Sequence, residues 1–185
     1  MKKIILFVVC LIIISCKEEK KETVKDLKNE KKEKQQVLKN IKDPKTVFEY
    51  IEGGDKSYGV NIDASIENLV SVSNVSLFYE KESKKTFIII QLKEGFNENL
   101  YDKYRLVVRT FPYSTEDLRP DTIKLGRDFD SWYSNLYNHS DGINDYLYAP
   151  IGSIDAFKKV RIQFLEKNKK RFTREPIEVN DLAAR

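Results

Sequence analysis

The sequence is poor in the residues from which catalytic and metal centres are usually built. Its 185 residues include one histidine and two cysteines, and both cysteines lie within the first 16 positions. A metal site made from several histidines is therefore excluded, as are cysteine-based zinc sites and thiol catalysis beyond residue 16. The chain also lacks a Gly-rich phosphate loop, a GxSxG nucleophile motif and an internal repeat. We expect neither a cofactor nor a metal.

No apolar run in the sequence is long enough to cross a membrane. The longest spans positions 4 to 14 and has eleven residues, whereas a spanning helix needs roughly 20. It follows the basic start Met1-Lys2-Lys3 and ends just before Ser15 and Cys16, where the chain becomes strongly charged. This order of segments is typical of a signal peptide with a short hydrophobic region.

The residues around Cys16 resemble the lipobox of bacterial lipoproteins. Ile13-Ile14-Ser15 supplies an aliphatic, a variable and a small residue before the cysteine. In that family diacylglycerol is attached to the sulfur, and a signal peptidase cuts just before the cysteine. The resemblance implies that residues 1–15 are removed, Cys10 among them, and that lipidated Cys16 begins the mature chain. Its one sulfur would then carry lipid, which excludes a disulfide framework. The alternative is an ordinary secretory signal with an incidental cysteine.

The segment after Cys16 is a charged leader. Lys17, Glu18 and Glu19 resemble the lysine-plus-acidic-pair export signal of some Bacteroidota lipoproteins, which implies display on the outer face of the outer membrane. The alternative is that these charges are only a solvated leader. Residues 17–45 hold eleven lysines and seven acidic residues, with no aromatic residue and no glycine. We therefore expect residues 16–45 to form a tether, either disordered or a fraying helix.

Residues 46–185 are expected to form one globular domain. They contain 20 basic and 22 acidic residues, so the basic character of the whole chain belongs to the leader and the tether. A nucleic-acid-binding domain needs a basic face. Nucleic acid is therefore not expected as a partner.

The hydrophobic pattern of this domain favours β-structure. After a short helix at about 44–52, capped by Asp43 and stopped by Gly53-Gly54, the period changes to two. Strands are predicted at 75–79 and 87–92, which form a hairpin, and at 104–111, 160–164 and 177–179, with further candidates at 58–62, 66–72 and 146–149. We predict a mainly β fold, an antiparallel β-sandwich with one or two short helices, with an α+β arrangement as the alternative.

An aromatic segment interrupts the strands. Phe129, Trp132, Tyr133, Leu136 and Tyr137 fall at helical spacing, which predicts a short helix with these residues on its buried face. The alternative is a platform for flat ligands such as sugars, made from rings that are close in the sequence. The residues of this platform are Trp132, Tyr133, Tyr137, Tyr146 and Tyr148.

The remaining polar candidates carry weak signals. His139 is followed by Ser-Asp-Gly, which favours a surface turn over a catalytic base. Asp128 with Asp130, or Asp141 with Asp145, could bind calcium or form a glycosidase pair, although the spacing does not match an EF-hand. Asp121-Thr122-Ile123 resembles the O-glycosylation tripeptide of exported Bacteroidota proteins, which implies a sugar on Thr122.

Two classes of function remain open from the sequence. The first is a non-catalytic, lipid-anchored binding or structural module of the outer membrane, held by its lipid and contacting an envelope protein or a glycan. The second is a small lipid-anchored hydrolase that uses paired carboxylates. The two differ in one respect that coordinates can show, because a hydrolase needs two aspartates that converge in a cleft.

Overall fold

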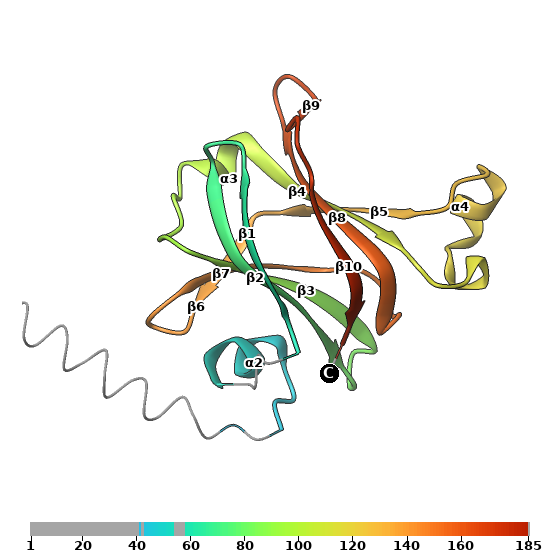
Figure 1. The fold of residues 1–185 in the computed structure, drawn as a ribbon, viewed down its shortest axis with the longest axis horizontal. Helices are drawn as coiled ribbons and strands as arrows, with labels where there is room; N and C mark the ends of the chain where they lie inside the picture. Colours follow the sequence, from blue (N-terminus) through green and yellow to red (C-terminus); the bar gives the residue numbers. More distant parts are fainter. Residues whose placement is uncertain (1–40, 42, 54–57, 185) are drawn as a thin grey trace, which may run out of the picture. The chain divides into compact units, whose positions relative to one another are not determined.

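Two antiparallel sheets pack face to face and enclose the main core (Figure 1). The structure is a computed structural model that describes residue 41 and residues 43–53 and 58–184, all within the compact unit Asn40–Arg185. Sheet A has the strand order β1 (Val60–Ile66), β2 (Val70–Glu80), β3 (Lys85–Leu92), β7 (Asp145–Pro150) and β6 (Tyr137–Ser140). Sheet B has the order β10 (Ile177–Ala183), β8 (Ala156–Glu166), β4 (Tyr104–Phe111) and β5 (Asp130–Asn135), and β9 (Arg171–Phe172) also pairs with β8. The predicted β-sandwich is confirmed.

Alternating side chains of both sheets fill the space between them. The inward residues of the central strands are almost fully buried: Val75, Leu77, Ile88, Ile90 and Leu147 from sheet A, and Leu106, Val108, Val160, Ile162 and Phe164 from sheet B. Full burial of such a side chain stabilises the fold by about 1.5–3 kcal/mol. This repeated gain is why strands with a period of two settle into these two layers.

The predicted hairpin and most of the predicted strands are present. Val75 pairs with Ile90 and Tyr79 with Thr86 in the β2–β3 ladder. The strand predicted at 66–72 is wrong, because Ile66 ends β1 and Val70 begins β2. Glu67 between them has a φ of 48°, a left-handed conformation that reverses the chain.

A short helix covers the outer face of sheet A. α2 (Val47–Gly53) places Val47, Tyr50 and Ile51 against the sheet, where they form a second core with Phe78, Ile89 and Tyr146. The predicted position is close, but Asp43 is not the cap. Thr46 Oγ1 accepts the hydrogen bond of the Glu49 amide at 3.2 Å, as in a capping box.

The helix predicted over the aromatic segment is wrong. Trp132 and Tyr133 lie in β5, and Tyr137 lies in β6, so the chain passes from sheet B to sheet A near Leu136. The exposed edge of β4 offers backbone donors and acceptors that a strand satisfies, and aromatic residues favour strands. The helical spacing therefore results from two consecutive strands in different sheets.

Short helical turns occupy the remaining connections. α3 (Leu100–Lys103) precedes β4, whereas the 3₁₀ turn η2 (Thr115–Asp117) and α4 (Pro120–Lys124) belong to the long connection between β4 and β5. This connection, residues 112–129, projects to one side of the sandwich (Figure 1). The buried carboxylate of Asp130 holds it, because it accepts hydrogen bonds from the Arg119 amide at 3.2 Å and from the Thr122 hydroxyl.

Candidate functional site

The most exposed ring cluster lies on the outer face of sheet A, where β6 and β7 meet α2. Tyr137 stands opposite Tyr148 in the β6–β7 ladder, and their ring centroids are 5.9 Å apart. The ring centroid of Phe48, in α2, lies 5.6 Å from that of Tyr148 and 5.1 Å from that of His139. These four residues are called the aromatic patch. Phe48 is 45% exposed and Tyr137 46%, so solvent reaches a large part of both rings.

The docking of α2 assembles this patch. His139 Nε2 lies 2.7 Å from Glu52 Oε1, which ties β6 to the last turn of the helix. Beneath the helix, the rings of Tyr50 and Phe78 stack with centroids 5.0 Å apart. Phe48 lies at the side of this second core, because position 48 falls on the flank of the helix face that the buried positions 47, 50 and 51 form. From there its ring reaches the rings of Tyr148 and His139.

Tyr148 of the patch carries a neutral phenol at physiological pH. Burial raises the pKa of Tyr148 above its ordinary value, and the neighbouring Tyr137 raises it further. A neutral phenol offers an apolar ring face together with a hydroxyl that both donates and accepts. The aromatic patch can therefore stack against a flat or ring-shaped molecule and hydrogen-bond its rim.

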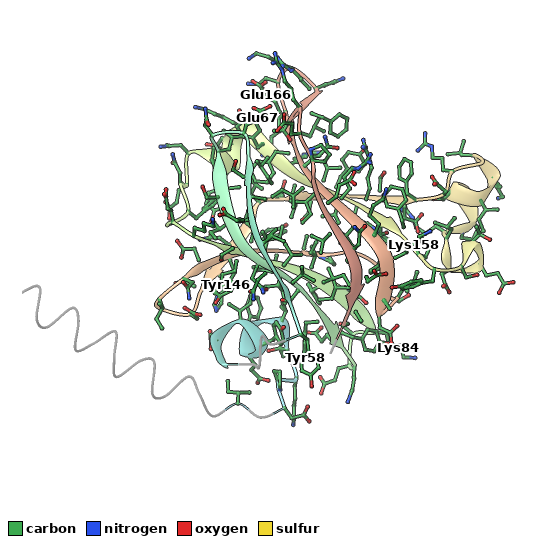
Figure 2. The ribbon with its side chains drawn as sticks, in the orientation of Figure 1. Tyr58, Glu67, Lys84, Tyr146, Lys158 and Glu166 are labelled. Carbon is green, nitrogen blue, oxygen red and sulfur yellow. The ribbon has the colours of Figure 1, made fainter. Side chains whose placement is uncertain are left out.

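The five predicted platform residues do not form one surface. Tyr137 and Tyr148 come together in the aromatic patch. Tyr146 lies between sheet A and α2 (Figure 2). Its side chain is 1% exposed. Its hydroxyl donates to Asp141 Oδ2 at 2.6 Å, and its pKa is raised by burial and then by this hydrogen bond. Trp132 and Tyr133 belong to β5 in sheet B. The prediction grouped these residues because they are close in the sequence, but the structure divides them between two sheets.

Trp132 faces the interior from the edge of sheet B. It pairs with Val108, a core residue, and its indole Nε1 donates to Thr110 Oγ1 at 3.0 Å. The guanidinium carbon of Arg119 lies 4.6 Å from the ring centroid and covers the indole. The prediction that Trp132 packs against the core is thus confirmed, although on a strand, whereas its neighbour Tyr133 is 55% exposed.

Phe48 and His139 are members of the patch that the sequence reasoning did not place there. The prediction that His139 lies in a surface turn is wrong, because His139 lies in β6 and the turn begins two residues later, at Asp141. The turn is made by the residues after it, where Asp141 Oδ1 accepts the amides of Ile143 and Asn144 at 2.9 and 2.8 Å. The signal for Phe48 was its flanking position in the predicted helix.

Three of the aspartates proposed as catalytic pairs, Asp130, Asp141 and Asp145, hold the backbone or side chains of the fold. Asp130 is bound by the Arg119 side chain, Nε to Oδ1 at 3.0 Å, in addition to the bonds given above. Asp145 Oδ2 accepts the amide of Phe96 at 2.7 Å, and Asp141 holds its turn and Tyr146. Asp128 is exposed. Within residues 41–184, as far as they are described, no group of three or more His, Cys, Asp or Glu side chains could hold a metal ion.

Thr122 is placed by the same network. Its side chain is 6% exposed, and its hydroxyl donates to Asp130. The hydroxyl is thus occupied in the folded domain, so a glycan on Thr122 would have to be attached before this segment folds.

The comparisons with known proteins add no assignment: no family model, curated protein or solved structure matches the chain. Cys16 and the leader residues Lys17, Glu18 and Glu19 lie outside the described residues. Among the helices that the structure describes, none is long and apolar enough to cross a membrane.

Proposed function

We propose that this protein is a lipid-anchored lipoprotein of the outer membrane whose β-sandwich binds a glycan at the aromatic patch. The observation that carries the binding role is the patch itself, in which two rings nearly half exposed, Phe48 and Tyr137, flank the ring of Tyr148. The anchor rests on the sequence around Cys16.

A glycan suits the patch for a physical reason. The faces of sugar rings carry C–H groups that pack on aromatic faces, and their edges carry hydroxyls that bond to polar rims. The rims here hold the phenol hydroxyls of Tyr137 and Tyr148 and the His139–Glu52 pair. Exposed aromatic residues grouped on one surface mark binding sites more often than single exposed side chains do.

Removal of the rings tests the binding role. Tyr137→Ala and Phe48→Ala should each weaken binding to the best polysaccharide of a neutral panel (laminarin, xylan, mannan and dextran) about tenfold, because a lost ring contact is worth up to about 1.5 kcal/mol. Tyr133→Ala is the matched control, since Tyr133 is an exposed tyrosine of the other sheet. Affinity electrophoresis measures the binding, and thermal melting verifies the fold.

Two results would contradict the glycan proposal. One is that no polysaccharide of the panel retards the wild-type protein. The other is that Tyr133→Ala weakens retardation as much as Tyr137→Ala, because binding would then not depend on the patch.

The anchor is tested separately through the two cysteines. Cys16→Ala should abolish incorporation of labelled palmitate and leave a precursor that no longer partitions into the detergent phase. Cys10→Ala should leave both properties unchanged, because Cys10 would be removed with residues 1–15. Palmitate incorporation in the Cys16→Ala protein would refute the lipobox interpretation.

Display on the outer face depends on the leader. In whole cells, added protease should cut the lysine-rich tether of the wild-type protein. Replacement of Lys17, Glu18 and Glu19 by alanine should retain the protein inside and protect it. If both proteins are cut to the same extent, these residues are not an export signal.

A further inference from the structure

Positive charge is concentrated on one strand pair of a domain that is otherwise acidic. Residues 158–174, which include most of β8 and all of β9, hold eight basic residues and one acidic residue. The whole of residues 46–185 holds 20 basic and 22 acidic residues. Two of these cations are ion-paired, Arg161 with Glu178 and Lys169 with Glu166. The others give this part of sheet B a local positive field that the net charge conceals, and this field attracts polyanions.

Aromatic rings hold Lys159 of β8, and also Arg109 of the neighbouring strand β4, in place on the outer face of sheet B. Lys159 Nζ lies 4.3 Å from the ring centroid of Phe111, its partner in the β4–β8 ladder. The guanidinium carbon of Arg109 lies between Phe129, at 5.6 Å, and Phe172, at 5.1 Å. An aromatic ring orients a cation but leaves its positive charge in place, whereas a carboxylate would neutralise that charge. Within the described residues Lys159 forms no ion pair, so its charge remains available to a ligand.

An open groove of about 510 Å³ lies beside these cations, between the connection 112–129 and the strands β8 and β10. Its lining brings together both signs of charge, with Lys158 and Lys159 from β8, Asp181 from β10 and Asp128 from the connection. Tyr113, 61% exposed, closes one side and donates its hydroxyl to Asp181 Oδ1 at 2.8 Å. The groove thus offers two ammonium groups, a phenol and two carboxylates.

We propose that this groove binds a segment of an acidic polysaccharide, one whose sugars carry carboxylates. The two lysines pair with sugar carboxylates, and Asp128 and Asp181 accept hydrogen bonds from sugar hydroxyls. The same two aspartates disfavour the other polyanions, because the continuous phosphates of a nucleic acid or of an anionic bilayer offer them no donor and repel them. The site lies on sheet B and needs neither the aromatic patch nor the lipid anchor.

The test compares two pairs of consecutive lysines, Lys158 with Lys159 and Lys169 with Lys170. They lie near opposite ends of β8, and the labelled residues Lys158 and Glu166 mark these ends in Figure 2. The probe is polygalacturonate, with dextran as its neutral counterpart, and the full-length protein is titrated in detergent by calorimetry. Lys158→Gln with Lys159→Gln should weaken polygalacturonate binding about tenfold. Lys169→Gln with Lys170→Gln removes the same charge from the β8–β9 turn and should change it less than about twofold.

A third variant distinguishes the polyanions by the sign of its effect. Asp181→Asn should weaken polygalacturonate binding, because the amide is a weaker acceptor for the sugar hydroxyls and Lys158 and Lys159 already neutralise the sugar carboxylates nearby. It should strengthen binding to single-stranded DNA and to phosphatidylglycerol vesicles, because their phosphates gain only the relief of repulsion. Asparagine tolerates the left-handed backbone of residue 181, φ 52°, so the fold should survive the change. Equal losses in the two lysine variants would overturn the proposal. So would DNA or vesicles that bind the wild type as tightly as polygalacturonate, or an absence of polygalacturonate binding.

Discussion

Replacement of Asp130 should release the connection that forms one wall of the groove. The side chain of Asp130 is 2% exposed and accepts hydrogen bonds from the Arg119 amide, the Arg119 Nε and the Thr122 hydroxyl. Asp130→Ala leaves the buried Thr122 hydroxyl and the part-buried Arg119 amide without an acceptor, at about 1–3 kcal/mol each. The ion pair with Arg119 adds little, because the arginine side chain is 49% exposed. The expected total is about 3–5 kcal/mol.

Urea denaturation measures this loss, and a neighbouring aspartate provides the control. Asp128→Ala should change the free energy of unfolding by less than about 0.5 kcal/mol, because Asp128 is exposed. Asp130→Asn keeps one acceptor oxygen and should fall between the two. A double-mutant cycle of Asp130→Ala with Thr122→Ala should give a coupling of about 1–2 kcal/mol.

Either of two results would contradict the role of Asp130 in holding the connection. If Asp130→Ala and Asp128→Ala destabilise equally, the buried hydrogen bonds do not carry the effect. If the cycle gives no coupling, Thr122 and Asp130 do not act together, and the hydrogen bond between them does not contribute to the stability of the connection.

Three further changes test the interior. Trp132→Ala should cost about 3 kcal/mol, at the lower end for core aromatics because the ring is partly exposed, and an equal melting temperature would contradict its inward position. Gly152→Ala should cost about 1–3 kcal/mol for two reasons. A Cβ at this position would lie 2.9 Å from Trp132 Cζ2, and the φ of Gly152, +104°, strains any residue with a side chain. In a Trp132→Ala background the clash is removed, and only the cost of the backbone strain should remain. Tyr146 keeps its proton in the folded state, where its pKa is raised, but loses it near pH 10 when unfolded, so stability should fall above about pH 10. Tyr146→Phe should flatten that fall in urea midpoints measured between pH 8 and pH 11.5, and an unchanged slope would show that Tyr146 does not cause it.

The sequence by itself determined the local elements of the sandwich. In β8 the alternation of Val160, Ile162 and Phe164 with Arg161 and Gln163 needed no knowledge of the partner strands, because a strand with one buried face must alternate. The same holds for the hairpin of β2 and β3, whose polar turn separates two apolar runs. Composition alone also distinguished the lysine-rich segment 17–45 from the near-neutral sequence that follows it.

Only the tertiary structure decided which residues share a surface. The spacing of Phe129, Trp132 and Tyr137 fits a helix as well as two strands, and the choice depended on backbone bonds with β4 and β7, which lie far away in the sequence. The aromatic patch joins position 48 to position 148 because α2 docks on sheet A. The local positive field of sheet B could not be recognised from the net charge of residues 46–185, because the 20 basic and 22 acidic residues nearly cancel. A sequence pattern indicates the periodicity of a segment, but shared surfaces arise from contacts between segments. Those contacts form only when the sheets close over their common core.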